Sequence, residues 1–312
     1  MRRLISFILT IAIVAFVLEL YWEHSKTSVH AAGMQQAGTA LTLPLRPNSV
    51  RFAVVGDNGT ADSSEYQVGE QMQKAQQISK FNFVLMLGDN LYGGSSVRDY
   101  QDRFERPYKA MLDEGVIFYA SLGNHDDNNE VSYAPFHMNG NRYYAYWQGN
   151  VEFFALDTNY MDGSQLDWLQ KELRESTATW KIAYFHHPLY SSGKTHGSSR
   201  ELRLTLEPLF EKYGVNVVLA GHDHVYERVV PQNGILYFVL GSSGKLRNGD
   251  LRNDSLKAAG FDSDRCFMLV EIAGDEFYYQ TISRTGQTVD SGVFKRQAQA
   301  AATAPEAAPA LR

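Results

Sequence analysis

The stretch "VNVVLAGHDH", residues 215–224, contains a pattern that recurs along the chain and predicts its fold. An apolar, β-branched run ends in a short polar cluster with two histidines and an aspartate. Short runs rich in Val, Phe and Tyr favour buried strands over helix fragments. The same form occurs earlier in "VRFAVVGDNG" (50–59), "FNFVLMLGDNLY" (81–92), "GVIFYASLGNHDD" (115–127) and "WKIAYFHHP" (180–188).

Helical patterns lie between several of these predicted strands. The residues that share a helical face are Val68, Met72, Ala75 and Ile78 in the first, Leu166, Leu169 and Leu173 in the second, and Leu202, Leu206, Leu209 and Phe210 in the third. Ser164, with Asp167 three positions later, is the predicted N-cap of the second helix. Strands that alternate with helices predict an α/β fold whose strands are largely parallel. Ligands bind at the carboxyl ends of such strands, so the five polar clusters should converge on one site.

The C-terminal part of the chain has a different pattern. The runs "GILYFVLG" (234–241), "CFMLVEIAG" (266–274) and "EFYYQTIS" (276–283) follow one another with turns and no helix between them. They predict an antiparallel extension that completes a second sheet. The expected fold is therefore two packed mixed β-sheets flanked by helices, a four-layer α-β-β-α sandwich.

Composition divides the chain of 312 residues into four segments. Residues 1–22 combine Arg2 and Arg3 with an apolar run, which predicts an export signal or an N-terminal membrane anchor, with the remainder of the chain outside the cytoplasm. Residues 23–47 are small and polar and are expected to be a linker. Residues 48–296 are expected to form one domain, and the low-complexity residues 297–312 a disordered tail. The domain would be periplasmic, extracellular or membrane-anchored.

Charge and cysteine content exclude some classes of function. A formal net charge of −6 provides no basic field for nucleic acid. The single cysteine, Cys266, excludes an internal disulfide and a cysteine-rich zinc site. A bound metal must therefore rely on His, Asp, Glu, Asn or Tyr. Cys266 lies in an apolar run and is expected to be a packed core thiol.

The polar clusters together supply a set of metal donors. They contain Asp57; Asp89 and Tyr92; Asn124, His125 and Asp126; His186 and His187; and His222, Asp223 and His224. A lone aspartate at a strand end usually caps a turn, and a lone histidine is usually a hydrogen-bonded core residue. Five clusters of this kind point instead to a shared function. Imidazole and carboxylate ligands suit zinc, manganese or iron, and more than four ligands indicate two ions, which can act on displacement at phosphorus.

The motifs "GDNG", "GDNLY", "GNHD", a histidine after an apolar strand, and "GHDH", in this order, resemble those of the calcineurin-like metallophosphoesterases. "GDNLY" is similar to the Gly-Asp-x-x-Tyr element of the purple acid phosphatase branch, and the chain resembles its small, single-domain members. Ala183 departs from the family pattern, which usually has Val at that position. The resemblance implies Asp57, Tyr92 and His224 as ligands of one ion, Asn124, His186 and His222 as ligands of the other, and Asp89 as the bridge.

The resemblance also implies cofactors and catalytic residues. Two carboxylates and a tyrosinate suit one trivalent and one divalent ion, so iron(III) with iron(II), zinc or manganese is expected. His125 would bind the phosphoryl group and assist the leaving group, and Asp126 would orient it. His196 resembles a substrate-side histidine, although it could also be an exposed loop residue. His187 and Asp223 are expected to lie beside the ligands without being ligands.

The expected function is hydrolysis of phosphate monoesters by a metal-bound hydroxide, as in an acid phosphatase acting on small phosphorylated substrates. One alternative is a phosphodiesterase or nucleotidase on the same scaffold with zinc or manganese in both positions, and Tyr92 argues against it. The other is a catalytically silent, membrane-tethered binding module. The intact ligand set argues against this second alternative.

Overall fold

A computed structural model describes residues 40–296 of the chain. The predicted export segment 1–22, residues 23–39 of the predicted linker and the predicted tail 297–312 lie outside the described residues. Within the described part of the chain, no helix is long and apolar enough to cross a membrane.

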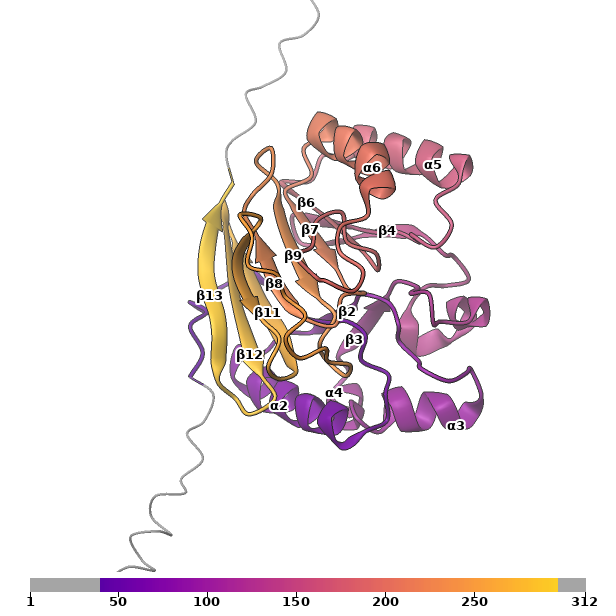
Figure 1. The fold of residues 1–312 in the computed structure, drawn as a ribbon, viewed down its shortest axis with the longest axis vertical. Helices are drawn as coiled ribbons and strands as arrows, with labels where there is room; N and C mark the ends of the chain where they lie inside the picture. Colours follow the sequence, from indigo (N-terminus) through magenta and orange to yellow (C-terminus); the bar gives the residue numbers. More distant parts are fainter. Residues whose placement is uncertain (1–39, 297–312) are drawn as a thin grey trace, which may run out of the picture. The chain divides into compact units, whose positions relative to one another are not determined.

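Two mixed sheets form the centre of the domain (Figure 1), in the strand orders β13-β12-β11-β1-β2-β3 and β10-β8-β9-β7-β6-β5-β4. The first contains β1 (Val50–Val55), β2 (Phe83–Met86), β3 (Ile117–Ala120), β11 (Cys266–Ala273), β12 (Glu276–Ser283) and β13 (Thr288–Lys295). The second contains β4 (Tyr144–Gln148), β5 (Val151–Ala155), β6 (Trp180–Phe185), β7 (Val217–Ala220), β8 (Tyr226–Val229), β9 (Leu236–Leu240) and β10 (Lys257–Phe261). Because β1, β2 and β3 are parallel, as are β5, β6, β7 and β9, the carboxyl ends of each set lie at one edge of its sheet.

The main core lies between the two sheets. Phe52 and Phe83 of the first sheet stack with ring centroids 5.1 Å apart. Phe153 of the second sheet meets them edge-on, at 5.3 Å and 5.5 Å. Alternate residues point to the other face, so Ala53 lies in a separate cluster beneath the helices. The predicted packing of two sheets is therefore confirmed.

Helices cover the outer face of each sheet (Figure 1). The helix α2 (Ser63–Ser79) packs on the first sheet, and α5 (Gly163–Glu175) and α6 (Arg200–Tyr213) pack on the second. The predicted four-layer arrangement is confirmed. Shorter elements are α3 (Val97–Tyr100), η1 (Gln101–Glu105), α4 (Lys109–Asp113), η2 (Asn128–Ser132) and η3 (Ala134–Phe136).

Two details of the helices differ from the prediction. Ile78 is 50% exposed, and Ser79 is buried in its place. Ser79 follows Val68 by three full turns of about 3.6 residues each, whereas Ile78 has rotated off that face. The N-cap of α5 is Asp162, whose side chain accepts a hydrogen bond from the Gln165 N–H, so the prediction of Ser164 is wrong.

The C-terminal strands do not all join the second sheet as predicted. The strand β9 does so, in parallel with β7. The strand β11 instead pairs antiparallel with β1, and β12 and β13 extend the first sheet further. One edge of β1 is already paired with β2, and β11 occupies the other. The predicted extension therefore belongs mainly to the first sheet.

The last residues of the predicted linker pack against the domain. Leu43 is buried, and the Leu45 N–H donates a hydrogen bond to Glu271 Oε2 at 2.7 Å. The Thr42 N–H donates to Gln280 Oε1 at 2.8 Å. The packed part of the chain therefore begins before the predicted boundary at residue 48.

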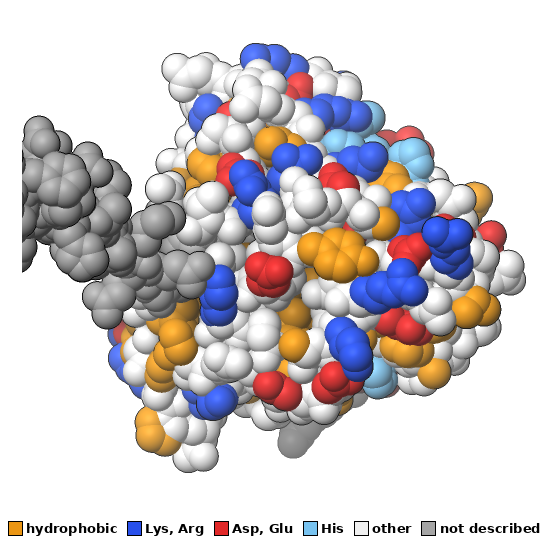
Figure 2. All heavy atoms as spheres, turned by 90° about the horizontal axis from the view of Figure 1, so that it is seen from below, with side chains coloured by type: hydrophobic (Ala, Val, Ile, Leu, Met, Phe, Trp, Pro, Cys, Tyr) orange, Lys and Arg blue, Asp and Glu red, His pale blue; other side chains and the backbone are white. Residues whose placement is uncertain are grey.

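Acidic and basic side chains are mixed on the face of the domain that Figure 2 shows. Histidine side chains gather at one edge of this face, beside several Lys and Arg side chains. This face therefore carries no broad patch of one charge.

Candidate metal centre

The five polar clusters follow the carboxyl ends of five parallel strands. Asp57 follows β1, Asp89 follows β2, Asn124 follows β3, His186 follows β6 and His222 follows β7. Three of these residues have left-handed backbone, with φ values of 53° for Asp57, 53° for Asp89 and 71° for His222. Such conformations are costly for residues other than glycine, and they persist where the surrounding structure enforces them, often at functional sites.

Glycines let the loops approach one another. A methyl group on Gly221 would lie 2.6 Å from Asp57 Oδ2 and 2.9 Å from the Leu87 carbonyl oxygen. A methyl group on Gly123 would overlap the side chain of Asp89. The glycines of "GHDH" and "GNHD" are therefore required by close contact between loops from different strands.

The first group of donors surrounds the Tyr92 hydroxyl. Its oxygen lies 2.8 Å from Asp89 Oδ2, 3.1 Å from Asp57 Oδ1 and 3.2 Å from His224 Nε2. His224 Nε2 also lies 3.3 Å from Asp57 Oδ1. The structure thus brings together all the residues that the resemblance assigns to one ion.

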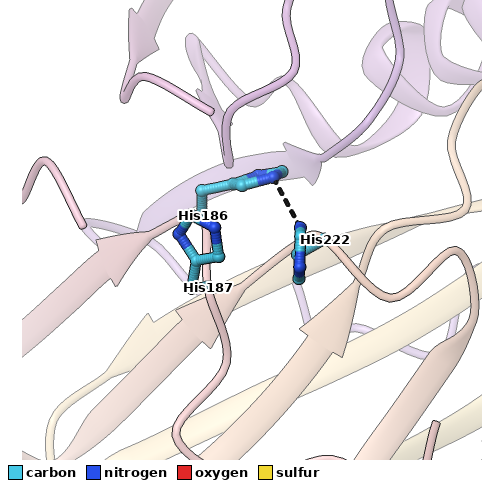
Figure 3. A group of neighbouring side chains, drawn as sticks. All are labelled: His186, His187 and His222. Carbon is cyan, nitrogen blue, oxygen red and sulfur yellow. Dashed lines mark hydrogen bonds between the residues drawn. The ribbon is translucent and has the colours of Figure 1, made fainter. Parts of the chain in front are cut away.

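The second group of donors surrounds His186 Nε2, which lies 3.0 Å from Asn124 Oδ1, 3.1 Å from His222 Nδ1 and 3.4 Å from Asp89 Oδ1. Figure 3 shows the His186 and His222 rings meeting at the ends of their strands, with His187 beside them. His186 Nδ1 lies 3.0 Å from the Leu87 carbonyl oxygen. This contact assigns the proton to Nδ1 and leaves Nε2 as the donor to a metal. Asp89 contacts both groups, because its Oδ2 lies beside the Tyr92 hydroxyl and its Oδ1 lies beside His186 Nε2.

The charges of the two groups favour cations. Asp57 and Asp89 are 0% and 1% exposed, and within residues 40–296 neither forms an ion pair with Lys or Arg. Burial raises the pKa of Asp57 well above its usual range. The nearby His186 lowers this pKa, and the charge of Asp89 raises it further. Two adjacent buried carboxylates without a cation are costly.

The histidines and Tyr92 complete a donor set that suits metal ions. Burial, followed by the nearby histidines, lowers the pKa of His222 to about 2. Burial, followed by Arg247, lowers the pKa of His224 to about 4, so both imidazoles are neutral donors. Burial and both carboxylates raise the pKa of Tyr92, so only a bound cation would favour its phenolate. The residues present therefore fit two metal ions with mixed nitrogen and oxygen ligands.

His125 and His196 border the two donor groups. The His125 N–H donates a hydrogen bond to Asp89 Oδ1 at 2.9 Å, and its exposed ring lies 4.9 Å from that of Tyr92. The exposed ring of His196 lies 4.2 Å from that of His222. Both side chains are thus placed beside the donors and open to solvent.

Asp126 has a different place from the one expected. Its carboxylate accepts hydrogen bonds from the Asn90 side chain at 2.8 Å, the Leu91 N–H at 3.0 Å and the Gly123 N–H at 2.8 Å. In the described part of the chain it makes no hydrogen bond with the imidazole of His125. Asp126 therefore joins the loops after β2 and β3, and the expectation that it orients His125 is not met.

His187 and Asp223 make contacts outside the two donor groups. His187 Nδ1 lies 3.0 Å from Thr158 Oγ1, although the ring is close enough to His186 and His222 to offer a further nitrogen to an ion. Asp223 Oδ2 accepts hydrogen bonds from Ser191 Oγ at 2.5 Å and from the Gly197 N–H at 3.0 Å.

A sixth loop of the site is absent from the sequence prediction. Thr158 and Asn159 follow β5, and Asn159 Nδ2 donates a hydrogen bond to the Gly123 carbonyl oxygen at 3.0 Å. Both residues line a polar cavity of about 400 Å³ next to Asn124. The stretch "VEFFALDTN" (151–159) has the same apolar-then-polar form as the other five and could have been found by the same rule.

Comparisons with known proteins agree with this geometry. The family model described as calcineurin-like phosphoesterase matches residues 50–226. The chain is 26% identical over 293 residues to tartrate-resistant acid phosphatase type 5 of Rattus norvegicus, covering 78% of this chain and 89% of the relative.

Two solved structures share the fold. The purple acid phosphatase PPD1 from yellow lupin has a TM-score of 0.69 at 19% identity, over 82% of this chain and 55% of that one. GAP50, the anchor in the inner membrane complex of Plasmodium, has a TM-score of 0.68 at 18% identity, over 80% of this chain and 89% of that one. The chain belongs to the calcineurin-like phosphoesterase family and is a metal-dependent phosphoric ester hydrolase.

Proposed function

We propose that this protein is an exported acid phosphatase that hydrolyses phosphate monoesters at a dinuclear metal centre. The position of the Tyr92 hydroxyl, between two buried carboxylates and beside His224, is the observation that supports this proposal most strongly. One ion would be held by Asp57, Tyr92 and His224, the other by Asn124, His186 and His222, with Asp89 between them.

The donor chemistry also supports a choice of metals. A phenolate from Tyr92 is a hard anionic ligand, which favours iron(III) at that position, with iron(II), zinc or manganese at the other. Such a pair of ions supplies Lewis acidity and a water molecule of lowered pKa.

The protein's own residues would bind the substrate and control its protons. His125 is exposed beside Tyr92, where its imidazole can contact a phosphoryl oxygen and donate a proton to the leaving alkoxide. The hydrogen bond from the His125 N–H to Asp89 fixes its backbone relative to the metal ligands. His196, whose ring lies beside that of His222, would contact the substrate from its own loop.

Export is proposed from the sequence of residues 1–22 and from the similarity to acid phosphatases. The activity is tested by comparing para-nitrophenyl phosphate with bis(para-nitrophenyl) phosphate at pH 5 and pH 8. We expect higher kcat/KM for the monoester and a preference for the acidic pH, with Asp89→Ala as the inactive control. A preference for the diester, or activity only at pH 8, would contradict the proposal.

A further inference from the structure

A loop that carries two basic residues lies beside the candidate metal centre. Residues 241–256 connect β9 to β10 and contain Lys245 and Arg247, both half-buried. The Lys245 N–H donates a hydrogen bond to the Asp57 carbonyl oxygen at 2.9 Å, and the Arg247 N–H donates one to the His224 carbonyl oxygen at 3.0 Å. The backbone of this loop is therefore bonded to two residues of the first donor group.

The Lys245 side chain lies beside a ring of that donor group. Lys245 Nζ lies 4.3 Å from the centroid of the Tyr92 ring. The Arg247 N–H is bonded to the His224 backbone, and the Nη1 atom of its guanidinium is buried. Both residues therefore lie beside the first donor group.

Neither cation has an acidic partner. Within residues 40–296, Lys245 and Arg247 form no ion pair, and Arg247 Nη1 is buried without a hydrogen-bond acceptor. A buried guanidinium N–H without an acceptor is costly, and a cation beside a metal site opposes metal binding. A bound anion would accept a hydrogen bond from the buried guanidinium N–H. It would also reduce the repulsion between the two cations and a bound metal.

Hydrogen bonds to residues 192–195 hold the loop 241–256 in place. The Lys194 N–H donates a hydrogen bond to the Asp250 carbonyl oxygen at 2.9 Å, and Thr195 Oγ1 donates one to Asp250 Oδ1 at 2.7 Å. The Arg252 N–H donates to the Ser192 carbonyl oxygen at 2.9 Å. The loop that carries Lys245 and Arg247 and the loop that carries His196 are therefore fixed relative to each other before a ligand binds.

We propose that Lys245 and Arg247 form a second anion subsite, which binds a phosphoryl group adjacent to the one being hydrolysed. This inference rests on the proposed phosphatase function. The metal ions would already balance the charge of the reacting phosphoryl group, so two further cations are in excess for a simple monoester. They match a substrate whose leaving group is itself a phosphate, such as a nucleoside diphosphate.

The test measures binding to the metal-loaded protein by calorimetry, using methylenediphosphonate and methylphosphonate, which are not hydrolysed. We expect wild type to bind the diphosphonate more tightly. In the variant Lys245→Gln/Arg247→Gln the ratio of the two affinities should fall at least tenfold, as expected for lost charge-assisted hydrogen bonds. Lys212→Gln is the matched control, because Lys212 Nζ also lies over a tyrosine ring, 4.9 Å from the centroid of Tyr213, on α6.

An unchanged ratio in the double variant, or equal affinities in wild type, would overturn the subsite. If the double variant does not fold, Lys245→Gln alone is measured, and a ratio equal to that of wild type again overturns it. The proposed function fails separately, when wild type binds the phosphonates but hydrolyses no phosphate monoester.

Discussion

Replacement of Gly221 by alanine should damage the metal centre through one methyl group. Gly221 has no positive φ, so the backbone itself accepts alanine. The added Cβ would lie 2.6 Å from Asp57 Oδ2, 2.9 Å from the Leu87 carbonyl oxygen and 3.4 Å from His186 Nδ1. Asp57 must move, which breaks its 2.8 Å hydrogen bond from the His222 N–H.

The expected cost can be estimated from these contacts. Overpacking costs about 1–3 kcal/mol. Loss of a hydrogen bond to a carboxylate costs about 1.5–3 kcal/mol. The free energy of unfolding of Gly221→Ala should therefore be about 2.5–6 kcal/mol lower than that of wild type, a large part of a typical total of about 5–15 kcal/mol. Displacement of Asp57 should also weaken metal binding about 10–100-fold, by analogy with the loss of outer-shell support at metal sites.

Urea unfolding in the presence of a chelator measures the first effect, and metal content after dialysis against a weak chelator measures the second. Gly163→Ala is the matched control, since a Cβ there meets nothing within 4 Å and the residue opens α5. The control should keep the stability of wild type to within about 1 kcal/mol. A Gly221→Ala protein with the stability and metal content of wild type would show that the loops after β1 and β7 do not need the close contact at Gly221.

Two further predictions concern single side chains. His125→Ala should lower kcat about 100-fold or more while metal content is kept, because we propose that His125, beside the donor groups, donates a proton to the leaving group. Equal loss of kcat and metal would show that it is a ligand or structural residue. The free energy of unfolding of Glu130→Gln should increase relative to that of wild type as pH rises. Burial raises the pKa of Glu130 to about 8, so folding favours its protonated form, and wild type loses stability between about pH 4.3 and pH 8. Urea unfolding at pH 5.0 and 7.5 should show the difference between the two proteins growing by about 3 kcal/mol. A constant difference would assign the pH dependence to other groups.

The sequence predicts the convergence of the site because each loop follows a parallel strand. That rule places Asp57, Asp89, Asn124, His186 and His222 together, as the structure does. The resemblance to a family added Tyr92 and His224 to one group of donors, since spacing alone does not say which loop faces which.

Other features depend on contacts that no local pattern reports. The partner of β11 depends on which edge of β1 is left open by β2. The place of Asp126 depends on the backbone N–H groups of Leu91 in a neighbouring loop and of Gly123 in its own loop, and side-chain patterns do not report backbone donors. Lys245 and Arg247 lie more than a hundred residues from Tyr92 and follow a strand with no polar cluster typical of a metal site. The anion subsite proposed for these two residues therefore depends on contacts that only the folded chain creates.

We propose above that Tyr92 binds a trivalent iron in a dinuclear centre. The visible spectrum of the purified protein, together with its metal content, tests this most directly. We expect iron in the protein and a tyrosinate-to-iron(III) absorption band that disappears in Tyr92→Phe. A colourless, fully active protein that contains only zinc or manganese would contradict it.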